Sequence, residues 1–216
     1  MNPLIEGIAA PLPFSNLDTD QIMPKQFLRI IDKAGLDKGL LYDLRFDEHG
    51  APRPGFVLNQ DAYAGASILV AGPNFGCGSS REHAVWGLQQ FGIRAVLAPS
   101  FGEIFYFNAV NNGLLVVSLP AAQIDELLAR VSNTEPSGNQ RLTIDVMAGV
   151  VRAADGWKAD FSLPERHRHM FAQGQDMVDA SLLQLPEVEQ FEARHWARHP
   201  WMKDVARTVR DRLNAG

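Results

Sequence analysis

Short apolar segments alternate with longer amphipathic stretches through the middle of the chain. The segments at 66–71, 94–98 and 114–119 have the length of strands. Their nearly continuous apolar character is typical of strands that are buried on both faces of a parallel sheet. We therefore expect three strands of one sheet in this part of the chain.

The stretches between these segments have the spacing and the end signals of helices. After the first strand, apolar residues recur on one helical face up to Gly92, a residue typical of a helix C-terminus. A second helix is expected over 101–111, and a third begins at Pro120 and runs to about Val131. This alternation predicts a βαβ core with right-handed crossovers.

The flanking regions have different patterns. Residues 1–14 indicate a short strand and a turn, and 29–61 combine irregular apolar positions with many glycines and prolines. We expect short helical turns and a long mobile loop in the second of these regions. Apolar runs at 142–146, 150–154 and 157–161, separated by short turns, indicate a hairpin followed by a further strand.

Beyond residue 162 the pattern becomes helical and continues to about residue 213, with interruptions at Gly174, Pro186 and Pro200. The sequence therefore predicts an α/β fold. We expect a mixed β/β/α domain over 1–162 and a helical C-terminal extension of the same domain over 163–216.

Composition and charge exclude several classes of protein. The chain has 216 residues, of which 46% are hydrophobic and 21% charged, enough for one globular domain with a sizeable core. A net charge of −5 argues against a broad nucleic-acid-binding surface, and no apolar run reaches the roughly 18 residues that a membrane span needs. The N-terminal residues lack the regions of a secretory signal, so we expect a cytoplasmic protein.

Cys77 is the one cysteine of the sequence. A single thiol excludes an intramolecular disulfide. Iron–sulfur clusters usually take three or four thiolates, so we expect none held by this chain alone. Two interpretations of Cys77 remain, a nucleophile with His83 as its base or a small residue packed beneath a tight turn.

The most informative stretch follows the first buried strand and reads Asn-Phe-Gly-Cys-Gly-Ser-Ser-Arg-Glu-His over 74–83. Gly76 and Gly78 allow positive φ and close approach of the backbone to a ligand. Free N–H groups and the dipole at the start of a helix attract anions. Arg81 adds a planar guanidinium that can hold a carboxylate through two parallel hydrogen bonds. The pattern predicts a small ligand that carries a carboxylate.

Other glycine-rich turns fit this stretch less well. A P-loop needs a lysine followed by Ser or Thr after its second glycine, and a dinucleotide-binding turn needs a glycine or alanine where Arg81 stands. Neither condition is met. The local sequence still leaves open a plain strand-to-helix turn that is capped by Ser79 or Ser80, with Glu82 near the third helical position.

The longer pattern resembles a known family. Residues 74–83 are similar to the signature of the small subunits, or swivelling domains, of the aconitase superfamily, and in particular to that of bacterial 3-isopropylmalate dehydratase small subunits. A second block over 16–28, Asn-Leu-Asp-Thr-Asp-Gln-Ile-Met-Pro-Lys-Gln-Phe-Leu, resembles the N-terminal motif of that family. The likeness continues through 101–105 and Asn108 and covers about residues 1–200. It implies the swivelling β/β/α fold.

The resemblance also implies a reaction and the residues that perform it. Enzymes of this family interconvert 2-isopropylmalate and 3-isopropylmalate through 2-isopropylmaleate in leucine biosynthesis. The resemblance assigns the catalytic base to Ser79, the grip on a substrate carboxylate to Arg81, and substrate hydrogen bonds to Ser80 and Gly78. Backbone N–H groups of residues 78–81 at a helix start would stabilise the serine alkoxide. Asp20 matches an acidic position that orients an arginine or the active-site network.

The block around Asp20 allows a second interpretation. Residues 18–20 also fit a capped turn, because Asp and Thr close turns through side-chain hydrogen bonds. Lys25 and Arg29 lie nearby in the sequence and could add positive charge for a second carboxylate, but the sequence assigns neither of them a role.

Dehydration also needs a Lewis acid for the departing hydroxide, and this sequence offers no ligand set for one. It contains no HExxH motif, and the pairs His167/His169 and His195/His199 lack the further ligands of a metal site, so we expect no metal in this chain. The resemblance implies a large partner subunit that holds a [4Fe–4S] cluster with one open iron site, and a small hydroxy-dicarboxylate as substrate.

Two other functions stay open from the sequence. Related small subunits serve homoaconitate, citraconate or dimethylmaleate. A stand-alone carboxylate-binding module without catalysis would show a complete, closed pocket in the isolated chain.

Overall fold

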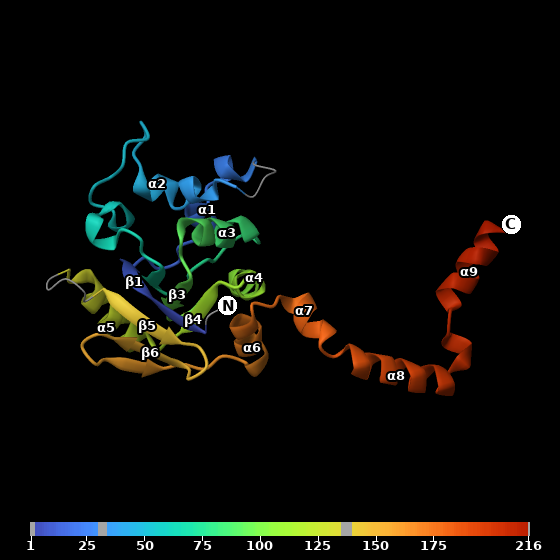
Figure 1. Cartoon of the computed structure of the whole chain (residues 1–216). Helices are drawn as coiled ribbons and strands as arrows, with labels where there is room; N and C mark the ends of the chain where they lie inside the picture. Colours follow the sequence, from blue (N-terminus) through green and yellow to red (C-terminus); the bar gives the residue numbers. More distant parts are fainter. Residues whose placement is uncertain (1–2, 30–33, 135–139, 216) are drawn as a thin grey trace. The chain divides into compact units, whose positions relative to one another are not determined.

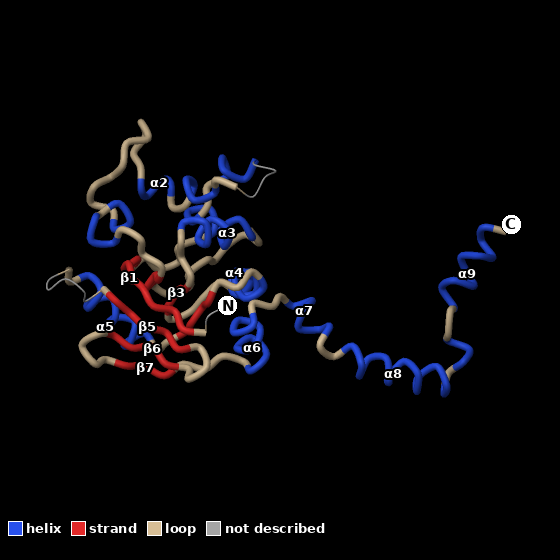
Figure 2. Tube along the Cα trace, viewed as in Figure 1, coloured by secondary structure: helices blue, strands red, loops and turns tan. Residues whose placement is uncertain are grey.

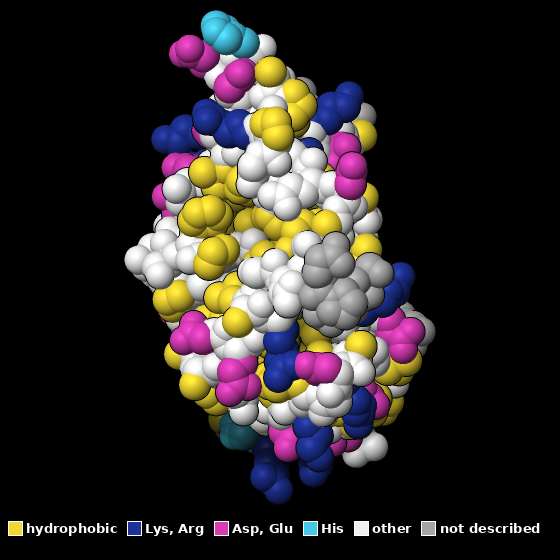
Figure 3. Space-filling view, turned by 90° about the vertical axis from the view of Figure 1, so that its left-hand side faces the viewer, with side chains coloured by type: hydrophobic (Ala, Val, Ile, Leu, Met, Phe, Trp, Pro, Cys, Tyr) yellow, Lys and Arg dark blue, Asp and Glu magenta, His cyan; other side chains and the backbone are white. Residues whose placement is uncertain are grey.

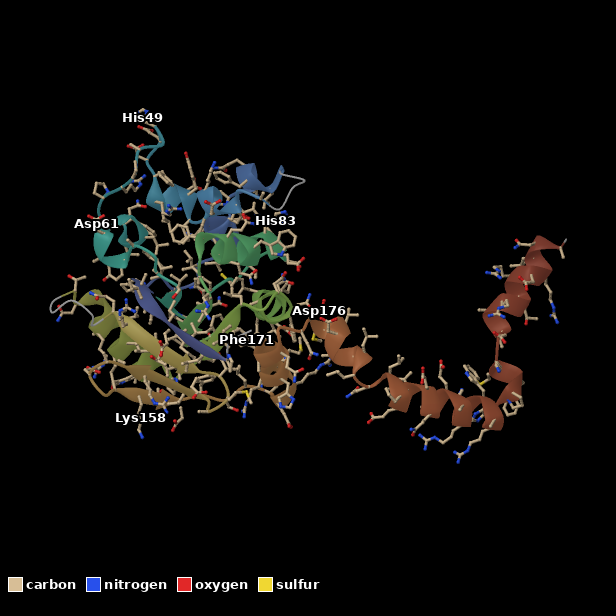
Figure 4. The ribbon with its side chains drawn as sticks, viewed as in Figure 1. His49, Asp61, His83, Lys158, Phe171 and Asp176 are labelled. Atoms are coloured by element: carbon tan, nitrogen blue, oxygen red, sulfur yellow. The ribbon has the colours of Figure 1, made fainter. Side chains whose placement is uncertain are left out.

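The structure is a computed structural model that describes residues 3–29, 34–134 and 140–215 (Figure 1). It divides the chain into two compact units, Met1–Asp176 and Met177–Gly216. The predicted division after residue 162 separates strands from C-terminal helices, whereas the structure groups α6 (Glu165–Gln173) with the sheet. Phe171 of α6 packs in a core cluster with sheet residues, and Asp176 ends the first unit (Figure 4).

The described part of the first unit is built on a seven-stranded mixed sheet with the order β4-β3-β2-β1-β5-β6-β7 (Figure 2). The strands are β1 (Leu4–Leu12), β2 (Ile68–Ala71), β3 (Ala95–Ala98), β4 (Leu115–Ser118), β5 (Arg141–Asp145), β6 (Val150–Ala153) and β7 (Lys158–Asp160). Strands β1 to β4 are parallel, and β5 to β7 continue the sheet in antiparallel pairs. The predicted parallel core and the C-terminal hairpin with its further strand are confirmed.

Strand β1 joins the two halves of the sheet. Its first part pairs with β5 and its last part with β2. Successive residues of a strand direct their N–H groups to opposite sides, and the Ala9 N–H donates to the Gln140 carbonyl on the β5 side at 2.8 Å. Pro11, two residues later, faces the same side at a point where the pairing with β5 has ended. This proline therefore removes no hydrogen bond from the sheet.

The parallel strands are buried on both faces, which explains their continuous apolar sequences. Leu69 and Val96 contribute to one core cluster with side chains of α3 (Glu82–Phe91) and α4 (Glu103–Asn111). Ile68 and Leu97, which alternate with them along the strands, contribute to a second cluster with side chains of α5 (Ala121–Ser132) and α6. Helices thus cover both faces, as Figure 1 shows.

Short helices occupy the chain between β1 and β2, as predicted for part of it. They are α1 (Thr19–Ile22), α2 (Tyr42–Arg45) and the 3₁₀ helices Lys25–Arg29, Leu36–Gly39, Val57–Asn59 and Asp61–Tyr63. The half-buried Arg45 donates to the Leu40 carbonyl at 3.2 Å, and its guanidinium lies 4.7 Å from the centre of the Phe91 ring. Residues 30–33 lie outside the described residues, and the mobility of this region stays a prediction.

The second unit consists of α7 (Met177–Leu182), α8 (Leu185–Arg198), a 3₁₀ helix (Pro200–Met202) and α9 (Val205–Asn214). Its helical character is confirmed. Gly174 ends α6 in the left-handed conformation, and Pro200 follows the end of α8. Pro186 does not interrupt a helix as expected, but lies in the first turn of α8, where the missing N–H would have no intrahelical partner.

None of the helices that the structure describes is both long and apolar enough to cross a bilayer. On the face of the molecule drawn in Figure 3, basic and acidic side chains are interspersed above and below a central band of hydrophobic side chains. That face therefore lacks the extended basic surface that binds nucleic-acid backbones.

His167 links α6 to α4. Its Nδ1 lies 3.1 Å from the Tyr106 hydroxyl, and burial together with the neighbouring Arg166 lowers the pKa of the imidazole from its ordinary value of 6.5. In the unfolded chain this pKa returns to about 6.5, so below that pH the unfolded state binds the proton more readily. We expect the free energy of unfolding to decrease as the pH falls from about 6.5 through the lowered pKa.

Urea unfolding at several pH values measures this dependence, with His167→Gln expected to reduce the slope below pH ~6.5. His169→Gln makes the same change at an exposed neighbour and provides the matched control. Equal slopes in the wild type and His167→Gln would contradict the prediction.

Candidate functional site

The candidate site lies at the carboxyl ends of the parallel strands β1, β2 and β3. The segments that follow these strands run side by side, because Cys77 forms an isolated parallel bridge with Asp18 and Phe75 forms one with Phe101. In open α/β sheets, ligands bind at this edge. Residues that are far apart in the sequence are therefore gathered where a ligand is expected.

The two glycines of the motif serve different purposes. Gly76 has φ +73°, and a Cβ atom there would lie 2.3 Å from the Phe105 ring, so both its conformation and its packing exclude a side chain. Gly78 has φ +94°, but a Cβ atom would meet nothing closer than Asp18 at 3.6 Å. Only the backbone conformation requires glycine at residue 78.

Two asparagines connect the first two loops. Asn16 and Asn74 both have a left-handed backbone, with φ +56° and +58°, and the Asn74 amide donates to Asn16 Oδ1 at 2.8 Å. The Asn74 N–H donates to Ser100 Oγ at 2.9 Å, which adds the loop after β3. The shape of the site thus depends on contacts among all three loops.

Cys77 packs within this arrangement. Its thiol donates to the Asn16 carbonyl at 3.4 Å. His83, labelled in Figure 4 in the first turn of α3, instead packs its ring against Trp86 with 4.8 Å between centroids. These contacts do not pair the thiol with the imidazole, so they support the interpretation of Cys77 as a packed small residue.

Arg81 and Asp20 form an ion pair through Nη1 and Oδ1. The Arg81 side chain is 16% exposed and that of Asp20 41% exposed. Lys25 Nζ lies 3.8 Å from the other Asp20 oxygen. Two positive charges therefore accompany one negative charge, which favours an anionic ligand. Arg29 ends the 3₁₀ helix Lys25–Arg29, and its side chain lies outside the described structure.

The capped-turn interpretation of residues 18–20 is confirmed for Asp18, and Asp20 makes a separate contact. Asp18 caps α1, because its carboxylate accepts the Gln21 N–H at 2.7 Å while Gln21 Oε1 accepts the Asp18 N–H at 3.1 Å. Asp20 is left to pair with Arg81. The capped turn therefore holds the carboxylate of Asp20 toward the guanidinium.

Ser79 and Ser80 are exposed and precede α3. The interpretation of either serine as the helix cap is wrong, because the helix begins at Glu82 and Arg81 occupies the cap position. The Arg81 N–H donates to the Ser79 carbonyl at 2.9 Å and so closes a tight turn before the helix starts. The serine hydroxyls are not engaged in capping.

The helix start differs in position from the one expected around residues 78–81. Residues 78–81 lie before the helix, and the N–H of Arg81 already has an acceptor. The first helical residues are Glu82 and His83, whose N–H groups begin the helix dipole. The helix dipole therefore begins at Glu82 and not within residues 78–81.

Glu82 has a structural role that the sequence did not reveal. Its carboxylate accepts from the Asn112 amide at 2.7 Å, and Asn112 in turn accepts from Trp86 Nε1 at 2.9 Å. These bonds connect α3 to the end of α4. The sequence indicated Asn112 only as part of a helix-ending turn, because its partners come from another helix.

Known proteins are similar to this chain over most of its length. Residues 4–122 match the family described as the aconitase C-terminal domain. The 3-isopropylmalate dehydratase small subunit 1 of Chromobacterium violaceum is 62% identical over 209 residues, which cover 97% of this chain and 97% of that protein. The chain belongs to the 3-isopropylmalate dehydratase small-subunit family.

Other members of this family support the assignment. The 3-isopropylmalate dehydratase small subunit of Phenylobacterium zucineum is 44% identical and covers 92% of this chain and 96% of its own length. The crystal structure of 3-isopropylmalate dehydratase from Methanocaldococcus jannaschii matches with a TM-score of 0.59 at 26% identity, covering 88% of this chain and 99% of that one. The family and the fold that the sequence motifs implied are confirmed.

The two motif glycines give a matched stability test. Gly78→Ala should lower the free energy of unfolding by about 1–2 kcal/mol, because alanine is strained at positive φ. Gly76→Ala should lower it by about 1–3 kcal/mol more, because its Cβ also meets the Phe105 ring. Urea unfolding of the two variants measures the difference. Equal losses in the free energy of unfolding would show that the Phe105 ring moves aside without destabilising the fold.

Proposed function

We propose that this chain is the small subunit of a hydro-lyase that interconverts 2-isopropylmalate and 3-isopropylmalate by dehydration and rehydration through 2-isopropylmaleate. The proposal rests on the family match, which covers 97% of the chain. It rests also on the site of this chain, where Asp20 pairs with Arg81 and the neighbouring Ser79 is exposed. The reaction is a step of leucine biosynthesis, which we place in the cytoplasm.

Arg81 is suited to hold one carboxylate of this dianionic substrate. A guanidinium has five N–H donors in one plane, and Asp20 engages Nη1. Asp20 therefore orients the plane and leaves other donors for the substrate. We assign further substrate hydrogen bonds to Ser80 and to the backbone of Gly78. Lys25 adds positive charge on the far side of Asp20.

Ser79 acts as the base in this proposal. Its alkoxide removes a proton from the carbon next to a carboxylate, the C–H electron pair forms the alkene bond, and hydroxide leaves the neighbouring carbon. In rehydration to the other isomer, hydroxide adds to the carbon that lost the proton, and the electron pair of the alkene bond takes the proton from Ser79 onto the carbon that lost hydroxide. The alkoxide is stabilised by the charge of Arg81 and by the start of α3, whose dipole is positive at this end.

The departing hydroxide needs a Lewis acid, and the residues of this chain do not fit an iron–sulfur cluster. The sequence has one cysteine. Within residues 3–29, 34–134 and 140–215, no three His, Cys, Asp or Glu side chains gather in a way that could hold a metal ion. We therefore assign a [4Fe–4S] cluster with one open iron site, which supplies the Lewis acid, to the large partner subunit.

The openness of the site supports a role for that partner. Ser79 and Ser80 are exposed, and the side chains of Asp20 and Lys25 are 41% and 74% exposed. A substrate bound beside Arg81 would remain in contact with water, which weakens the electrostatic effects that stabilise an alkoxide. A large subunit that covers this edge would exclude water. A self-contained carboxylate-binding module would instead enclose its ligand.

Anaerobic mixing of the chain with a cluster-bearing large subunit tests the proposal. We expect 3-isopropylmalate to yield an alkene only when both subunits are present. The ultraviolet absorbance of the alkene measures the reaction. Ser79→Ala should lower kcat at least ~100-fold without preventing assembly, because the base is lost. Ser162→Ala changes an exposed serine outside the site and should leave kcat unchanged.

Three outcomes would contradict the proposed function. They are turnover by the isolated chain, near-normal kcat in Ser79→Ala, and turnover of homoaconitate, citraconate or dimethylmaleate in place of isopropylmalate. The first would remove the need for a partner, the second would place the base elsewhere, and the third would assign the chain to a related hydro-lyase.

Arg81→Lys separates geometry from charge. Lysine keeps the positive charge but loses the planar pair of donors, so kcat/KM of the assembled enzyme should fall by about one to two orders of magnitude. The melting temperature should stay unchanged, because an ammonium can still pair with Asp20. Arg94→Lys changes an exposed arginine elsewhere and serves as control. Full activity would show that Arg81 contributes charge alone, and unfolding would show a structural role.

A further inference from the structure

Thr19 contacts the catalytic loop on both sides of Gly78. Its N–H donates to the Cys77 carbonyl at 2.9 Å, and its Oγ1 donates to the Ser79 carbonyl at 3.0 Å. The threonine is 1% exposed, so these bonds are shielded from water. Thr19 therefore holds the peptide group before Gly78, which adopts φ +94°, and the peptide group that follows Ser79.

The Ser79 carbonyl is a shared acceptor. It receives the Thr19 hydroxyl at 3.0 Å and the Arg81 N–H at 2.9 Å. Because two donors from different segments converge on one oxygen, the peptide plane that follows Ser79 has little freedom to rotate. The direction of the Ser79 side chain is then tied to the position of Arg81.

Thr19 is itself held in place. It is the first residue of α1, whose start is closed by the reciprocal bonds of Asp18 and Gln21. Its own carbonyl accepts the Met23 N–H at 3.0 Å. The next residue, Asp20, pairs with Arg81. One short helical turn thus contacts the backbone of Ser79 and the side chain of Arg81 through adjacent residues.

We infer that Thr19 is a positioning residue for the dehydration reaction and that its hydroxyl sets the place of Ser79 Oγ relative to a substrate held by Arg81. The inference rests on the proposed function. Thr19 acts through the Ser79 carbonyl and does not contact the reacting atoms. A loop that contains glycine without this bond would sample several directions of the Ser79 side chain, and small misplacements lower the rate of proton transfer strongly.

The test compares two substitutions of Thr19 in the assembled two-subunit enzyme. Thr19→Val keeps the shape and removes the donor, so we expect kcat to fall about 10- to 100-fold while KM changes less than about twofold. Thr19→Ser restores the hydroxyl and should recover most of kcat. Thr143→Val makes the same change at a half-buried threonine of β5, outside the site, and should leave kcat unchanged.

The inference would be overturned if Thr19→Val lowered kcat no more than Thr143→Val, if Thr19→Ser failed to recover kcat, or if KM alone rose. The last result would place Thr19 in substrate binding. If Thr19→Val does not fold, Thr19→Ala also removes the hydroxyl, and it does so without placing a valine methyl group against the Ser79 carbonyl. A wild-type enzyme that does not act on isopropylmalate would instead contradict the proposed function, so the two failures are distinguishable.

Discussion

The parallel pairing of β1 with β2, continued beyond the strand ends by the bridge between Asp18 and Cys77, is the constraint on which the site depends. It sets the register between two segments that lie some 60 residues apart, as the 60-residue separation of Thr19 and Ser79 shows. A shift of this register by one residue would displace α1, which directly follows the paired segment, relative to the loop after β2, and would separate Asp20 from Arg81. The ion pair, the contact of Thr19 and the turn at Gly78 all follow from that register.

Three consecutive residues divide the support of the site among them. Asp18 closes the first turn of α1, Thr19 holds the carbonyl of Ser79, and Asp20 orients Arg81. The ion pair contributes little to stability where Asp20 is partly exposed, since such pairs are worth about 0–1 kcal/mol. Its effect is on geometry, because a guanidinium that is held in one plane presents its remaining donors to a carboxylate without further ordering.

The exposed side of this arrangement accounts for the division of the enzyme into subunits in the proposed function. In that proposal this chain supplies a base and a carboxylate grip at one open edge of its sheet, while its single cysteine provides no ligand set for a cluster. The second unit carries apolar side chains such as Leu183 and Trp201 that are 65% and 69% exposed. Within that unit they have no core to enter, because none of its described helices contains a buried residue.

The sequence by itself determined the parallel core, the hairpin, the helix end at Gly92 and the motif that identifies the family, because burial on both strand faces and glycine conformation leave local patterns. It also placed Asp20, Ser79 and Arg81 among the candidate residues. Only the tertiary structure decided that Arg81 rather than a serine precedes α3, that Glu82 bonds to Asn112, and that Thr19 holds Ser79. These contacts join segments from different strands and helices, and their partners are set by sheet register and helix packing, which no local periodicity records.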